Sequence, residues 1–121
     1  MKLKEKYFEL FKVECLKWIK IFNLNCYRVR FEFKDCKDAD AQSITDSHSY
    51  VCTIALNINQ NYGEFKETQS LNDYIKYLAK HECIHVLLGR ISTTSSARFI
   101  SKDELTEAEE ELVVKLSNII K

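Results

Sequence analysis

The residues best suited to chemistry are His81, Glu82 and His85, which form the pattern His-Glu-x-x-His. On a helix of 3.6 residues per turn, histidines four positions apart lie only about 40° apart around the axis, so both rings can bind one metal ion. Glu82 would lie beside such an ion, free to hold a water molecule instead of binding the metal. Zinc-dependent hydrolysis requires this arrangement.

The residues around this motif predict a helix. Ser70 followed by Asp73 is typical of a helix start near Leu71, and Gly89 is typical of a helix end. The side expected to face the core carries Leu71, Tyr74, Leu78, His81, Glu82, His85 and Leu88. The alternative is that both histidines are ordinary half-buried residues. Against this alternative, two of the chain's three histidines lie four residues apart, which is the spacing of metal ligands on a helix, with a glutamate between them.

The remaining elements follow from hydrophobic periodicity. Steps of three and four residues predict a long helix over residues 3–22 that stops near Asn23 to Asn25, and Ser101 with Glu104 opens a last helix. Strands are predicted over residues 26–34, 41–45 and 50–58. We expect an α+β fold with a long N-terminal helix, a small antiparallel sheet of two to three strands, the motif helix and a C-terminal helix.

Composition limits the function classes. A chain of 121 residues is expected to form one domain, residues 1–121. Eighteen basic and eighteen acidic residues give no basic surface for nucleic acid. The charged start contains no apolar segment for a signal peptide or membrane span. Five cysteines without a Cys-x-x-Cys pair are expected to be reduced thiols. We therefore expect a cytoplasmic protein with no nucleic-acid or membrane partner.

Two histidines do not complete a catalytic zinc site, which usually has three protein ligands and an open position for water. His48 lies upstream in a predicted turn. The last helix offers five carboxylates, those of Glu104, Glu107, Glu109, Glu110 and Glu111. A carboxylate is the better third ligand, because a helix packed against the motif helix could present it. On a helical wheel, Glu109 is nearer than Glu110 to the apolar stripe.

These segments resemble small zincin-fold proteins of the gluzincin type found in phages and mobile elements, distant relatives of thermolysin-like peptidases. The resemblance is carried by His-Glu-Cys-Ile-His-Val-Leu-Leu-Gly at residues 81–89 and by Glu-Glu-Leu-Val-Val at residues 110–114. Glu110, Val113 and Leu116 match the spacing of the family's second helix.

The resemblance implies one Zn²⁺ ion bound by His81, His85 and Glu110, with Glu109 as the second choice for the third ligand. It also implies a zinc metallopeptidase in which Glu82 is the general base for a metal-activated water. The substrate would be a peptide or protein. Cys83 points away from both histidines and is not expected to bind the ion.

Other features of such a site stay open in the sequence. The strand at residues 50–58 is a candidate edge for an extended peptide. Tyr62, Tyr74, Arg98 and His48 are candidates for stabilising an oxyanion, and spacing favours none of them.

Two rival functions also follow from the sequence. A catalytically inactive zinc-binding domain that acts as a protein-interaction module fits the small size of the chain. A metal-free helical interaction protein is the third hypothesis. An open metal position would favour hydrolysis, and stability that is insensitive to a chelator would favour the metal-free protein.

Overall fold

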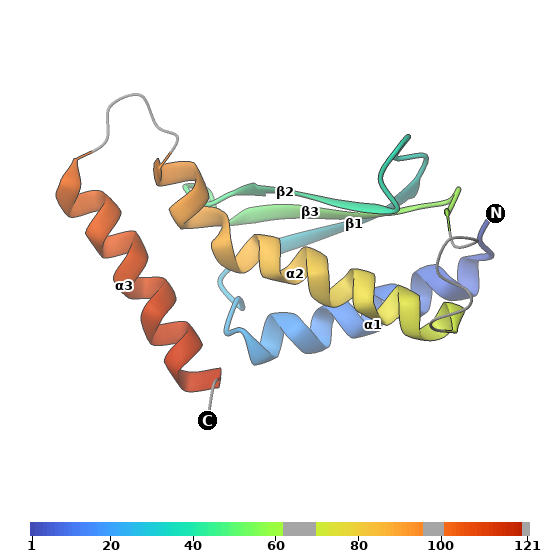
Figure 1. Cartoon of the computed structure of the whole chain (residues 1–121), viewed down its shortest axis with the longest axis horizontal. Coiled ribbons are helices and arrows are strands. Elements are labelled where there is room, and N and C mark those ends of the chain that lie inside the picture. Colours follow the sequence, from blue (N-terminus) through green and yellow to red (C-terminus); the bar gives the residue numbers. More distant parts are fainter. Residues whose placement is uncertain (62–69, 96–100, 120–121) are drawn as a thin grey trace.

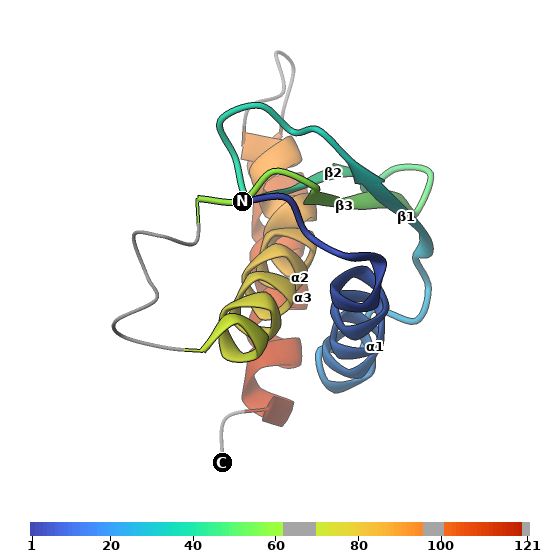
Figure 2. The same cartoon turned by 90° about the vertical axis from the view of Figure 1, so that its right-hand side faces the viewer.

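The computed structural model describes residues 1–61, 70–95 and 101–119 and confirms the α+β fold. Its elements are α1 (Glu5–Ile21), β1 (Arg28–Lys34), β2 (Ala41–Asp46), β3 (Val51–Asn57), α2 (Leu71–Ser95) and α3 (Lys102–Ile119). Helices α1 and α2 lie side by side against one face of the sheet, whereas α3 stands at the end of the molecule where α2 finishes (Figure 1, Figure 2). No helix among the described residues is long and apolar enough to cross a membrane.

The sheet is mixed, and the expectation of an antiparallel sheet is wrong. The strand order is β1-β3-β2, with β3 parallel to β1 and antiparallel to β2. Strand β3 takes the centre because it is the most apolar: Cys52, Ile54, Ala55 and Leu56 are all buried. Because β3 is paired on both sides, it cannot accept a peptide at its edge as expected. Within the described residues, β2 is paired on one side only.

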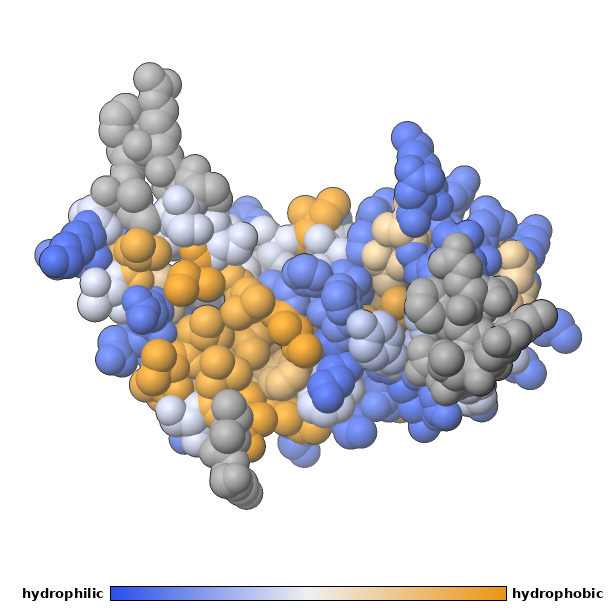
Figure 3. Space-filling model, in the orientation of Figure 1, coloured by the Kyte–Doolittle hydropathy of each residue, from blue (hydrophilic) through white to orange (hydrophobic). Residues whose placement is uncertain are grey.

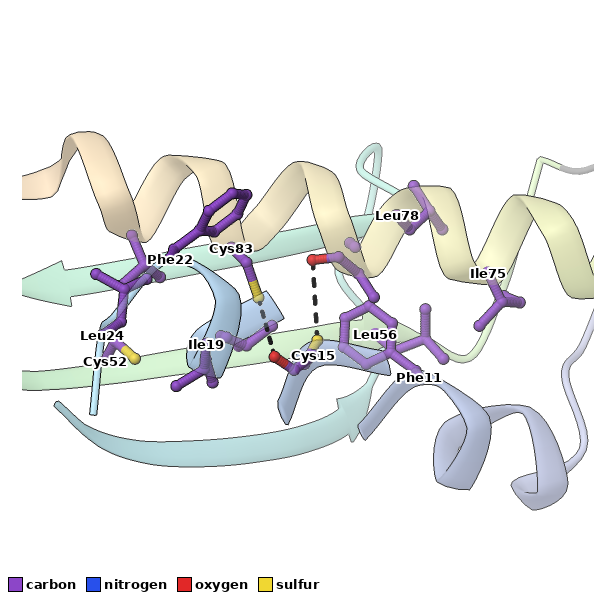
Figure 4. Packing of buried hydrophobic residues seen from close by; sticks show 14 of the residues in the cluster. Phe11, Cys15, Ile19, Phe22, Leu24, Cys52, Leu56, Ile75, Leu78 and Cys83 are labelled. Carbon is purple, nitrogen blue, oxygen red and sulfur yellow. Dashed lines mark hydrogen bonds between the residues drawn. The ribbon is translucent and has the colours of Figure 1, made fainter. Parts of the chain in front are cut away.

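The core lies between the sheet and the helices α1 and α2. It contains Phe11 and Ile19 from α1, Leu56 from β3, and Ile75 and Leu78 from α2 (Figure 4). The two helices also meet through thiols. Cys83 Sγ donates to the Cys15 carbonyl at 3.5 Å, and Cys15 Sγ donates to the Ala79 carbonyl at 4.0 Å. The motif helix is thus fixed to α1 on the side that Cys83 occupies.

The predicted helix starts are confirmed, and so is the end of α1. Ser70 Oγ accepts the Asp73 N–H at 3.2 Å, and Ser101 Oγ accepts the Glu104 N–H at 3.1 Å. The chain leaves α1 at Asn23, which has a φ of 55°. The amide of the next residue returns to the carbonyl of Ile19 at 2.8 Å, as in a left-handed helix cap.

Gly89 does not end the motif helix, so that prediction is wrong. Helix α2 continues to Ser95, and among the described residues no glycine has a positive φ. Gly89 is a buried position inside the helix, at the point where α2 lies against β2. Glycine fits there because α2 packs closely on β2, and the chain does not form a left-handed turn at this position.

All five cysteines are free thiols, and only Cys26 is exposed. Burial raises the pKa of Cys52 to about 11, and a hydrogen bond with Cys83 together with burial raises that of Cys15 further. Thiolates are the reactive form. We therefore expect one thiol per native chain, Cys26, to react quickly with an aromatic disulfide reagent at neutral pH. The Cys26→Ser variant should show no fast phase; fast reaction of a second thiol would contradict the packing described.

Candidate functional site

His81 and His85 lie together on α2. Their Nε2 atoms are 3.2 Å apart, and the ring centroids are 4.9 Å apart at an interplanar angle of 74°. Both histidines are exposed, so the expectation that they face the core is wrong. The buried side of α2 is centred on Ile75, Ala79 and Cys83. The histidines lie at the border of this side, where they can reach both each other and solvent.

Glu82 lies on the buried side of the helix, next to the histidines. Its residue is 5% exposed, and its side chain lines the cavities in front of His81. Within the described residues, its carboxylate makes no hydrogen bond or ion pair. Within the described residues, the fully enclosed side-chain polar atoms that lack a partner are Trp18 Nε1 and Gln60 Oε1. The oxygens of Glu82 are not among them, so its carboxylate keeps contact with solvent at the wall of the cleft.

The histidine pair fits a zinc ion. Zinc binds imidazole nitrogen at about 2.0–2.1 Å with tetrahedral angles, which places two such nitrogens about 3.3 Å apart. The observed Nε2 separation of 3.2 Å agrees with this value. In a metal-free chain, the same separation would let one imidazole donate a hydrogen bond to the other. Imidazole is a ligand that zinc favours, and the free Glu82 carboxylate is suited to a water beside it.

A cleft of about 530 Å³ opens in front of this group, between α2 and the edge strand β2. The strand contributes Ala41, Gln42, Ser43 and Thr45, and α2 contributes His81, Glu82, His85, Leu88, Gly89, Ser92 and Thr93. The strand itself was predicted, but no feature of the sequence placed it at the site. Its position depends on pairing with β3, which periodicity does not reveal.

A smaller cavity of about 290 Å³ adjoins the cleft and shares Ala41, His81 and Glu82 with it. Its far wall is acidic. Asp40 accepts the Tyr74 hydroxyl through Oδ2, and its Oδ1 accepts the Asn61 N–H at 3.0 Å. Of the oxyanion candidates, Tyr74 lines this cavity, but it donates its single hydroxyl hydrogen to Asp40.

Among the described residues, the oxyanion candidate His48 does not line the cleft. His48 lines a different cavity, beside Arg90 and Glu104. Tyr62 and Arg98 lie outside the described residues.

The structure does not bring Glu110 to the histidines. Glu110 is exposed and lines a cavity of about 440 Å³ with Arg90 and Lys115, apart from the cleft. Glu109 is exposed as well, and neither residue lines the cleft. Over residues 1–61, 70–95 and 101–119, no group of three or more His, Cys, Asp or Glu side chains is arranged to hold a metal ion. The third ligand thus stays a prediction.

Helix α3 is held in its position by half-buried apolar side chains, Leu112, Leu116 and Ile119, which pack against the core, and by ion pairs near the surface. Arg90 on α2 pairs with Glu107 at 2.9 Å and with Glu111. These carboxylates raise the pKa of the Arg90 guanidinium. Lys115 donates to the Asn23 carbonyl at 2.9 Å. Among the described residues of α3, only Ala108 is fully buried. The position of Glu110 therefore depends on a few contacts near the protein surface.

Replacing Arg90 by glutamine is expected to loosen α3 at little cost to the fold. Exposed ion pairs contribute less than about 1 kcal/mol, so the free energy of unfolding should fall by no more than that. Hydrogen exchange should accelerate in α3 but not in α2 around His85. The control Lys12→Gln removes an exposed ion pair with Glu9 within α1 and should not affect α3. Unchanged exchange in α3 would show that apolar packing, and not Arg90, holds this helix.

Comparisons of the chain with protein-family models, with curated proteins and with solved structures found no match.

Proposed function

We propose that this protein is a zinc-dependent peptidase resembling the gluzincins. The observation that carries the proposal is the pair of Nε2 atoms 3.2 Å apart beside Glu82, a largely buried residue whose carboxylate lines the cleft. Two neutral nitrogen donors and one free carboxylate at the wall of an open cleft are what metal-assisted hydrolysis needs. An ordinary pair of surface histidines would not need a buried glutamate beside it.

In the proposed reaction, His81 and His85 hold the ion, which when bound supplies a Lewis acid and lowers the pKa of a coordinated water. Glu82 accepts the proton of the attacking water and later gives it to the leaving amine. The burial of Glu82 restricts its side chain to the wall of the cleft, so that little orientation is lost when substrate binds. The Tyr74 hydroxyl, in the adjoining cavity, could stabilise the developing oxyanion only by giving up its hydrogen bond to Asp40.

The substrate edge in this proposal is β2, in place of the strand expected from the sequence. An extended peptide can add to a strand that is paired on one side only, through backbone hydrogen bonds. Ala41 and Ser43 of β2 line the same cleft as His81 and Glu82. A peptide bound along β2 would pass the histidine pair, which supports a peptide or protein as the substrate class.

Glu110 remains the proposed third ligand, with Glu109 as the second choice. For either to bind the ion, α3 must lie closer to His85 in the zinc-loaded protein. The presence of only one fully buried residue in the described part of α3, Ala108, supports such a change, although Leu112, Leu116 and Ile119 would have to repack against the core. Zinc would compensate by adding a ligand bond.

A second candidate function is a catalytically inactive zinc-binding domain that acts as a protein-interaction module. It is favoured by apolar side chains on the surface of α2 and α3. Ile84, Leu88, Val113 and Val114 are between 37% and 57% exposed. Figure 3 shows an apolar patch over α3 and the adjoining part of the molecule. An intracellular, reducing location is part of both proposals and is supported by the five free thiols.

The proposal is tested by loading the purified protein with zinc and incubating it with a mixture of unstructured peptides, whose fragments are identified by mass spectrometry. We expect cleavage that stops with a chelator and returns when zinc is added. Zinc binding with about one ion per chain but no cleavage would favour the interaction module. Absence of stoichiometric zinc would contradict both.

A further inference from the structure

Gly89 lies inside α2, one helical turn after His85. It has no conformational need to be glycine, because no glycine among the described residues has a positive φ. A glycine in a helix interior weakens the helix, since it loses more backbone freedom on folding than alanine does. Its place in the motif helix therefore requires a reason in the packing.

That reason is Thr45 on β2. A Cβ atom at position 89 would lie 2.8 Å from Thr45 Cγ2 and 3.3 Å from Thr45 Cβ. Carbon atoms pack at about 3.5–4.0 Å, so a methyl group would require the Thr45 side chain to rotate. Rotation cannot relieve the contact with Thr45 Cβ, which would move β2 away from α2 by about a few tenths of an ångström. The hydrogen atom of Gly89 allows α2 to lie directly on the edge strand.

This contact bears on the candidate site because the same two elements form the cleft. Gly89 and Thr45 both line it, together with His85 and Glu82. Helix α2 is continuous from Leu71 to Ser95, so the motif and Gly89 belong to one rigid element. A larger separation at Gly89 would therefore widen the cleft between Glu82 and β2.

We propose that Gly89 is a positioning residue that sets the distance between Glu82 and the free edge of β2, where the backbone of an extended peptide would bind. The inference rests on the proposed function, because it assigns that edge to the substrate. Where reacting groups must be aligned, a misplacement of about 1 Å can slow a reaction about a hundredfold. Gly89 would act in this way without touching substrate, metal or the reacting atoms.

The test is a double-mutant cycle of Gly89→Ala and Thr45→Ser, measured on zinc-loaded protein with a peptide that the unmodified chain cleaves. Thr45→Ser removes the Cγ2 atom, which makes the closest contact. In the otherwise unmodified chain, Gly89→Ala should lower kcat/KM about tenfold. In a chain that already carries Thr45→Ser, the same change should cost no more than about threefold. Zinc affinity, measured by competition with a chromophoric chelator, should stay the same, because His81 and His85 keep their helix.

Hydrogen exchange of residues 41–46 separates this inference from the proposed function. We expect faster exchange in Gly89→Ala and recovery in the double variant. This result would support the positioning role even if no peptide is cleaved, in which case only the proposed function has failed. Equal costs of Gly89→Ala with and without Thr45→Ser, or a double variant that does not fold, would overturn the inference, since Thr45 would then not be the limiting contact.

Discussion

Replacing Glu82 by glutamine is expected to reduce kcat on a cleavable peptide by about a hundredfold to ten-thousandfold. Glutamine has nearly the same shape as glutamate and keeps the side chain at the wall of the cleft, but it cannot accept the proton of an attacking water. Because Glu82 makes no hydrogen bond or ion pair within the described residues, no structural contact is lost. The thermal midpoint should therefore stay the same or rise slightly.

The measurement compares kcat, bound zinc and the thermal midpoint of Glu82→Gln with those of Glu5→Gln. Glu5 is an exposed carboxylate at the start of α1, and its change should leave all three quantities unaffected. In Glu82→Gln only kcat should fall, with zinc still bound. If Glu82→Gln cleaves the peptide as fast as the unmodified chain, Glu82 is not the general base.

The second large effect is expected when either histidine of the pair is replaced. His81→Asn and His85→Asn should each weaken zinc binding by more than about a hundredfold, because each removes one nitrogen ligand. Mutating a residue that only orients a ligand already lowers metal affinity by about tenfold to a hundredfold. The affinity is measured by competition with a chromophoric chelator. His48→Asn is the matched control, because His48 lines a different cavity and should not affect the ion.

The same titration distinguishes the candidates for the third ligand. If Glu110 binds the ion, Glu110→Gln should weaken binding while Glu109→Gln should not; the reverse result would favour Glu109. Full affinity in both variants would mean that zinc takes its third ligand elsewhere. Unchanged affinity in His81→Asn and in His85→Asn would contradict the whole site.

Local signals in the sequence predicted the elements well. The start of α2 at Leu71 was predicted because Ser70 caps it, and the end of α1 because the chain turns at Asn23. Such features depend on residues within one helical turn of each other. The pairing of β1 with β3 does not depend on residues so close in the chain, because Phe31 of β1 and its partner Ile54 of β3 are far apart in sequence. Periodicity therefore predicts strands but neither their order nor their relative direction, so the parallel pairing of β1 with β3 could not be predicted from the sequence.

The sequence predicted only the part of the candidate site that lies on a single helix. His81, Glu82 and His85 come together because they share α2. Their orientation was misjudged, because residues at the border of a buried stripe fit the helical pattern whether or not they are exposed. The sequence predicts a helix end at Gly89, because glycine is common where helices end. Glycine is also common where two elements pack closely, and only the position of Thr45 shows that Gly89 has this second role.

The position of α3 is the part of the site that no local pattern could provide. The predicted helix is confirmed, but its docking depends on ion pairs between elements, such as Arg90 with Glu107. These contacts arise from the path of the chain and not from periodicity. The third ligand is for this reason the least determined member of the proposed set.

The most direct test of the central claim is a crystal structure of the zinc-loaded protein, with anomalous diffraction measured on both sides of the zinc absorption edge. The account predicts one zinc peak within about 2.0–2.1 Å of Nε2 of both His81 and His85. The Glu82 carboxylate should lie beside the ion without binding it. A map with no peak at the histidine pair, or with zinc bound only elsewhere on the chain, would contradict the account.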